Sequence, residues 1–186
     1  GVALHLDGAR IWNAHVASGV SLTEYGKYFD TISVCLSKGL GAPVGSVMLS
    51  TKDRVAKARV WRKRYGAGMR QIGLLAAGAH YALDHNISRL ADDHIKAKKL
   101  AQVCASAAPS TINPYFVETN IVGLDLSQAN VSALEFASSA KQKGLLVSAL
   151  GKSYLRLVTH MDITDEANER AGAILQELLE RAFVLK

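Results

Sequence analysis

The sequence predicts an α/β protein in two parts. A mostly parallel sheet with helices is expected over residues 1–86, followed by a linking helix and a smaller α+β domain over residues 87–186. Short β-rich runs alternate with helical segments in the first part, as βαβ units require. A long amphipathic pattern then separates the two parts. With 186 residues, 49% of them hydrophobic, the chain can form a proper core.

The first part is predicted to hold strands at 2–6, 31–36 and 44–50 and helices at 10–17, 22–28, 53–64 and 69–85. Gly19 ends the first helix, and Thr51 is a fair N-cap for the third. Gly66 and Gly68 separate the third helix from the fourth, because glycine alone takes positive φ freely. Asn86 marks the end of the fourth helix.

The second part is predicted to open with an amphipathic helix at 87–107. Strands follow at 115–126, 145–148 and 154–159, with helices at 131–143 and from 164 onward. Gly144 suits the C′ position after the helix at 131–143. Thr164 is a good N-cap for the last helix, and Asp165 and Glu166 favour the positive end of its dipole.

The composition excludes several classes of protein. No apolar run approaches the roughly 20 residues that a membrane span needs. The net charge of +6 suggests nucleic acid, but much of the excess lies in one cluster with no RNA-binding signature beyond charge, so no nucleic-acid partner is expected. Cys35 and Cys104 lie far apart and outside any metal-type spacing, so we expect no metal site and a reducing, cytoplasmic setting.

Two motifs carry chemistry. HLDGAR (residues 5–10) and LSKGLGAP (residues 36–43) each follow a β-rich run, and Lys38 comes 31 residues after Asp7. Such positions lie at the mouth of a parallel sheet, where α/β folds bind ligands. Pyridoxal phosphate (PLP) needs this pair, since a lysine amine condenses with its aldehyde and an aspartate keeps its ring nitrogen protonated. Alone, Lys38 would be a solvated lysine and Asp7 a helix cap; together they predict a cofactor site.

The two motifs resemble the HxDGAR and SKGLGAPVGS blocks of the L-threonine aldolases, a PLP-dependent family of the fold-type I (aspartate aminotransferase-like) group. The resemblance covers nearly the whole chain and implies that Lys38 and Asp7 are catalytic and hold PLP. It also implies the later part of a fold-type I large domain followed by the small C-terminal domain.

Two arginines are candidate substrate ligands. Arg10 comes three residues after Asp7, about one helical turn on, and can point into the same mouth; we assign it to cofactor and substrate binding. Arg156 has apolar neighbours on both sides, so its charge needs an anion. That anion is either a protein carboxylate or the α-carboxylate of a substrate, which an arginine fork suits. The LRLVTH segment (residues 155–160) resembles the family's carboxylate-binding strand and favours the substrate.

Residues 61–71 resemble the family's WRK…GGGMRQ segment, with Ala67 in place of one glycine. In that family the segment lies at a subunit interface, where its basic residues reach a neighbouring active site. The resemblance therefore implies that Lys63 and Arg70 bind the cofactor, and that the protein is a homo-oligomer, a tetramer or a dimer. A solvated basic helix face is the alternative.

Three further polar residues are assigned structural roles. His5 is expected to alternate away from Asp7 on its strand. Asn120 is expected to make a strand-edge hydrogen bond, and His160 ends a strand.

The function implied is cleavage of L-threonine or L-allo-threonine to glycine and acetaldehyde by a PLP-dependent aldehyde-lyase. Another fold-type I PLP lyase, β-eliminating or tryptophanase-like, remains an alternative because it shares the lysine and the aspartate. A further alternative is a catalytically incomplete fragment. The chain opens inside a strand-like run without methionine, so we expect an N-terminal companion portion that carries the phosphate cup.

Overall fold

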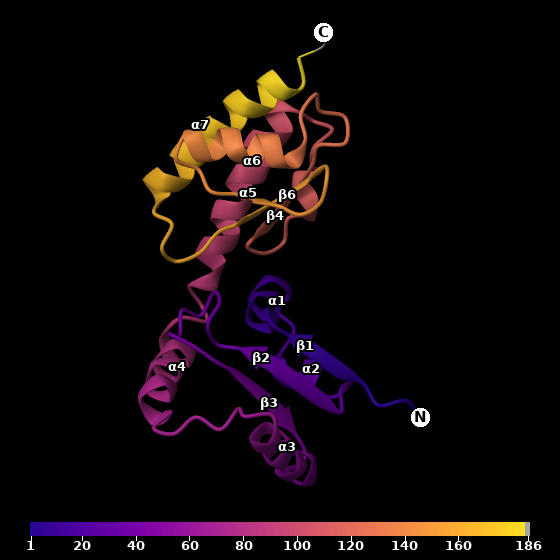
Figure 1. Cartoon of the computed structure of the whole chain (residues 1–186), viewed down its shortest axis with the longest axis vertical. Coiled ribbons are helices and arrows are strands. Elements are labelled where there is room, and N and C mark those ends of the chain that lie inside the picture. The colour runs from indigo at the N-terminus through magenta and orange to yellow at the C-terminus, as the bar shows by residue number, and fades with distance from the viewer. Residues whose placement is uncertain (185–186) are drawn as a thin grey trace. The chain divides into compact units, whose positions relative to one another are not determined.

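The computed structural model describes residues 1–184 (Figure 1). The chain divides into two compact units, Gly1–Leu90 and a second that begins at Ala91. Each unit has its own three-stranded sheet and its own buried core. None of the helices in residues 1–184 is long and apolar enough to cross a membrane.

In the first unit the strand order is β1-β2-β3. The strands are β1 (His5–Gly8), β2 (Thr31–Cys35) and β3 (Ser46–Ser50). β1 and β2 pair in parallel, with Asp7 opposite Ser33, whereas β3 pairs antiparallel to β2. These three strands thus supply one parallel and one antiparallel pair, because a loop of only ten residues returns the chain from β2 into β3.

The helices of this unit are α1 (Ile11–Ser18), α2 (Leu22–Gly26), α3 (Lys52–Arg64) and α4 (Gly73–His85). α1 ends as predicted at Gly19, whose φ is +72°. Thr51 is the N-cap of α3 but makes no side-chain capping bond. α4 begins four residues later than expected, because positive φ at Gly66 and Gln71 keeps the preceding segment irregular.

The second unit is an antiparallel sheet of order β4-β6-β5 with helices. Its elements are α5 (Leu90–Ala107), a 3-10 turn (Pro114–Phe116), β4 (Ile121–Asp125), α6 (Ala133–Gln142), β5 (Ser148–Ala149), β6 (Tyr154–Val158) and α7 (Asp165–Ala182). The predicted strand at 115–126 is therefore shorter, because Pro114 starts a turn whose cap is the Asn113 side chain. The predicted strand at 145–148 shrinks to two residues shifted to its end.

Local signals fix the helix ends of this unit. Ser132 and Glu135 form a reciprocal capping box at the start of α6. Gly144 follows α6 with a φ of +86°. The Thr164 hydroxyl accepts a hydrogen bond from the Ala167 amide at 3.1 Å, as its N-cap position predicts. One face of the sheet, with α5, α6 and α7, forms the larger buried core.

The two cysteines provide a test of this packing. Cys104 is fully buried on α5, and burial raises the pKa of its thiol to about 12. At pH 8 roughly one Cys104 thiol in 10⁴ is then ionised. Cys35 is only half-buried. We expect a disulfide reagent such as DTNB to titrate one thiol in the native chain and two in urea. Cys35→Ser should remove the fast thiol; two fast thiols in the native chain would contradict the buried position of Cys104.

Candidate functional site

The parallel pairing of β1 with β2 determines where Asp7 and Lys38 lie. The carboxyl ends of parallel strands meet at one edge of a sheet. Asp7 is the third residue of β1, and Lys38 follows the last residue of β2 by three positions. Asp7 is exposed, and its Oδ1 accepts a hydrogen bond from the Ala9 amide at 3.1 Å. This bond closes a turn ahead of α1 and does not cap it, because the helix begins at Ile11 with Arg10 at its N-cap and no side-chain capping bond.

The loop that carries Lys38 is closed by its own backbone. The Leu36 amide donates to the Gly45 carbonyl at 3.0 Å, and the Ala42 amide donates to the Leu36 carbonyl at 3.1 Å. The Gly41 amide donates to the Lys38 carbonyl at 2.8 Å, in a turn that needs a φ of +75° at Gly41. Lys38 itself stays half-buried. The loop backbone is therefore pinned while the lysine side chain remains partly accessible.

Buried side chains anchor the same loop in the core of the first unit. Leu36, Leu40 and Ala42 belong to a core cluster with residues of α4 and with Leu90. Gly39 is buried so tightly that a Cβ there would lie 2.7 Å from a methyl carbon of Leu90. A larger residue beside Lys38 would therefore require Leu90 or the loop backbone to shift.

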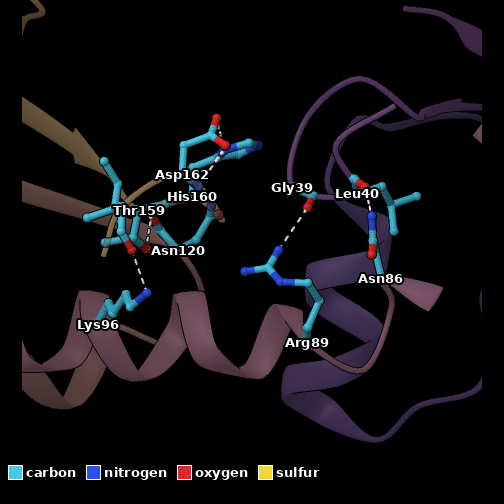
Figure 2. A network of polar contacts seen from close by, with 10 residues as sticks. Gly39, Leu40, Asn86, Arg89, Lys96, Asn120, Thr159, His160 and Asp162 are labelled. Atoms are coloured by element: carbon cyan, nitrogen blue, oxygen red, sulfur yellow. Dashed lines mark hydrogen bonds and ion pairs between the residues drawn. The ribbon is translucent and has the colours of Figure 1, made fainter. Parts of the chain in front are cut away.

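The segment that follows α4 supplies two side chains, those of Asn86 and Arg89, which donate hydrogen bonds to carbonyls of this loop. The Asn86 side-chain amide donates to the Leu40 carbonyl at 2.7 Å, and the Arg89 guanidinium donates to the Gly39 carbonyl at 3.4 Å. In Figure 2 both side chains reach the turn at Gly39 and Leu40. The sequence indicated only a helix end at Asn86. An asparagine that follows the last turn of a helix is a weak signal for such a bond.

Arg10 lies at the N-cap position of α1 and is half-buried. Its carbonyl accepts the Ala14 amide at 3.0 Å. Two residues later, Trp12 donates from its indole nitrogen to the Cys35 carbonyl at 2.8 Å. The segment that follows Asp7 is thus tied to the end of the strand that precedes Lys38.

Lys63 and Arg70 belong to a different segment, the connection between α3 and α4. Both are exposed. The Lys63 side chain lies over this loop, since a Cβ on Gly68 would meet its Cδ at 3.2 Å and its Nζ at 3.4 Å. The positive φ falls on Gly66, not on Ala67, so the loop accepts the alanine that replaces a family glycine. Ala67 and Met69 of this loop line a pocket together with Leu36 and Gly45 of the loop that carries Lys38, but Lys63 and Arg70 do not line it.

Arg156 lies in the middle of β6 in the second unit, paired with Gly123 of β4 and Ser148 of β5. It is half-buried, and its Nε is buried without a hydrogen-bond partner. Among residues 91–184, no carboxylate forms an ion pair with it. The alternative of a protein carboxylate partner therefore finds no support within this unit.

The polar residues assigned structural roles are partly as expected. Asn120 is buried and donates from its side chain to the Thr159 carbonyl at 2.9 Å (Figure 2). The Thr159 hydroxyl donates to the Asp93 carbonyl at 2.6 Å. This ties the end of β6 to the first turn of α5. His160 lies 3.1 Å from the Asp162 carboxylate. On α5, His94 follows Asp93, and burial lowers the pKa of its ring because burial disfavours the charged form.

The expectation for His5 is wrong in its geometry. His5 and Asp7 are two residues apart on β1, so both side chains lie on the same, exposed face of the sheet. The His5 ring lies 2.7 Å from the Thr31 hydroxyl on the adjacent strand. A contact between β1 and β2 is nevertheless a structural role, as expected.

Asn86→Ala tests how the loop is held. The substitution leaves the Leu40 carbonyl without its donor, which costs about 1–2 kcal/mol. We expect faster hydrogen exchange at the Gly41 and Ala42 amides, measured by NMR. Asn130→Ala is the matched control, because its amide also donates to a backbone carbonyl, that of Val184 at 3.0 Å. Unchanged exchange at Gly41 in the Asn86 variant would refute this support.

Comparison with known proteins is consistent with this geometry. The low specificity L-threonine aldolase of Escherichia coli K12 is 39% identical over 180 residues, covering 97% of this chain and 52% of that protein. Low-specificity L-threonine aldolase 1 of Arabidopsis thaliana is 42% identical over 165 residues, covering 88% and 46%. The chain thus spans about half the length of the curated relatives it matches.

The fold is also similar to that of solved structures. The threonine aldolase of Leishmania major matches with a TM-score of 0.70 at 19% identity, over 96% of this chain and 52% of that one. This likeness confirms the predicted α/β fold class. The beta-eliminating lyase family model matches residues 1–128, which include both motifs and the loop between α3 and α4. The chain belongs to the beta-eliminating lyase family.

Proposed function

We propose that this chain forms the lysine-, aspartate- and arginine-bearing part of a PLP-dependent aldolase that cleaves L-threonine or L-allo-threonine to glycine and acetaldehyde. The observation that carries the proposal is the pinned loop after β2, which holds Lys38 at the same sheet edge as Asp7. The names of the relatives support the substrate class. The chain's membership of the beta-eliminating lyase family supports the cofactor.

The residues present fit PLP. Asp7 is exposed, and only its Oδ1 has a hydrogen-bond partner among residues 1–90, so Oδ2 remains for a cationic ring nitrogen. Small residues flank Lys38, and the buried Gly39 leaves no side chain beside it on that side. When bound, PLP stabilises negative charge that develops at the α-carbon of an amino acid.

The roles of the residues follow from this chemistry. Lys38 would hold the cofactor through its amine and would release it to the amino group of the substrate. The Asp7 carboxylate keeps the ring nitrogen protonated, which keeps the ring able to accept electrons. The Cα–Cβ bond breaks, the β-hydroxyl loses its proton as the aldehyde forms, and a proton returns to Cα to give glycine.

The substrate carboxylate requires cations. Arg156, half-buried and with no ion pair to a carboxylate among residues 91–184, is proposed to bind it through a two-bond fork, helped by Arg10. By holding the carboxylate, these arginines would limit how the substrate turns about Cα and so would favour Cα–Cβ cleavage over loss of the α-proton.

A second chain is part of the proposal. Lys63 and Arg70 are exposed beside exposed apolar side chains, among them Trp61, Tyr65 and Met69. This surface is proposed to meet another copy of the protein, a dimer or a tetramer, in which both basic residues reach the neighbouring cofactor. The remaining half of the relatives' length would supply the other groups of the site.

A β-eliminating lyase is the second candidate, favoured by the family model that matches residues 1–128. The two reactions have different products. Acetaldehyde from L-threonine supports the aldolase, whereas pyruvate from L-serine or L-tryptophan without acetaldehyde supports the β-eliminating lyase.

Lys38→Ala is expected to abolish the visible absorption band that the wild-type chain acquires with PLP, because the cofactor is attached through this amine. Borohydride reduction followed by peptide mass spectrometry should locate PLP on the peptide that contains Lys38. Lys141→Ala, an exposed lysine on α6, is the control and should keep the band.

Equal uptake of PLP by the Lys38 variant would refute its assignment. If the wild-type chain takes up no cofactor alone but does so with the remaining portion of the protein, the alternative of an incomplete fragment is supported. If neither preparation takes up PLP, the proposed cofactor is wrong.

Arg156→Lys is expected to raise the KM for L-threonine about 10- to 100-fold with a smaller change in kcat. A lysine keeps the charge but loses the fork, and a hydrogen bond to a charged group contributes about 1.5–3 kcal/mol. Arg170→Lys, exposed on α7, is the matched control. A KM unchanged by the Arg156 substitution would remove this residue from the substrate site.

A further inference from the structure

The outward face of the sheet in the second unit differs from its core face. Leu155 and Leu157 of β6 point into the core, whereas Tyr154, Arg156 and Val158 alternate onto the other face. That face is only partly covered, since Tyr154 and Val158 are about 40% exposed, at 43% and 39%. Arg156 is therefore a charged residue on a half-open surface.

Gly123 stands directly opposite Arg156 in the antiparallel pair of β4 and β6. A Cβ built on Gly123 would lie 1.9 Å from the Tyr154 hydroxyl oxygen and 2.7 Å from its Cζ. The end of the Tyr154 side chain thus occupies the space that a side chain at position 123 would fill. Cβ atoms of residues that stand opposite each other in an antiparallel pair are about 5 Å apart. The phenol therefore lies beside the Cβ of Arg156.

This arrangement limits where the guanidinium can go. The space toward β4 is filled by the phenol, and on the other side Arg156 is paired with Ser148 of β5. The Nε of Arg156 is buried and has no hydrogen-bond partner. A guanidinium that is partly removed from water binds a carboxylate more strongly than a fully solvated one, because competing water is excluded.

We propose that Tyr154 is a positioning residue for Arg156: its ring, lying across Gly123, keeps the guanidinium in place and partly dehydrated for a substrate carboxylate. This inference rests on the proposed carboxylate role of Arg156. Position 123 is glycine in this arrangement because the Tyr154 phenol lies where a Cβ would be. The aromatic ring then lies beside the carboxylate end of the substrate.

The role belongs to the ring, not to the hydroxyl, which gives a conservative variant. Tyr154→Phe keeps the ring over Gly123, whereas Tyr154→Ala empties the space. Gly123→Ala forces the ring away because its Cβ would overlap the phenol. If displacement of the ring is its only effect, Gly123→Ala should change nothing further in a chain that already carries Tyr154→Ala.

The experiment is an NMR titration of the 15N-labelled chain with sodium acetate, with sodium chloride at equal ionic strength as the control for non-specific anions. The Arg156 Nε–Hε signal, identified by its loss in Arg156→Lys, reports binding without cofactor or turnover. We expect a saturable shift in the wild type and in Tyr154→Phe. The acetate affinity should fall about tenfold in Tyr154→Ala and in Gly123→Ala, and no further in the double variant.

The outcomes separate the two proposals. A saturable response in the wild type that is equally tight in Tyr154→Ala overturns the positioning role and leaves the carboxylate role of Arg156 standing. No response to acetate in the wild type overturns both roles. Should Gly123→Ala fail to fold, judged from its amide spectrum, the comparison of the Phe and Ala variants at position 154 decides. In the active enzyme, Tyr154→Ala should raise KM while kcat changes little.

Discussion

The parallel pairing of β1 with β2 is the constraint on which the candidate site depends. It brings Asp7 and the loop after Cys35 to one edge of the sheet. Several features of the first unit then hold that loop. Backbone bonds close it on itself, buried leucines anchor it in the core, and the Asn86 side chain binds its Leu40 carbonyl. The Trp12 indole ties α1 to Cys35, at the end of the strand before the loop.

The second unit presents a different physical problem. A sheet that buries one apolar face must leave the other to solvent or to a partner, and Arg156 lies on that other face with a buried Nε. A carboxylate that binds there would meet a guanidinium that is already partly removed from water. In the proposed arrangement, the glycine opposite and the tyrosine that crosses it prepare this cation for an anion, and no carboxylate among residues 91–184 forms an ion pair with it.

Much of the fold could be predicted from local pattern. Gly19, Gly144 and Thr164 lie at helix ends because their φ freedom or side-chain oxygen acts within a few residues. The pair of Asp7 and Lys38 could be found because strand ends and polar residues coincide. The delayed start of α4 could not, since it depends on a positive φ at Gln71 that its neighbours do not specify. The shorter strand before Ile121 follows instead from a local signal that the prediction did not use, the turn formed by Asn113 and Pro114.

The sequence by itself determined the fold class, the order of elements and the residues able to carry chemistry, because each of these leaves a short-range pattern of apolarity, turn residues or charge. Only the tertiary structure decided that Asn86 supports the Leu40 carbonyl, that Gly39 is fixed by Leu90, and that Tyr154 replaces the side chain missing at Gly123. These contacts join residues far apart in the chain. Their existence depends on strand register and on which face of the sheet is buried.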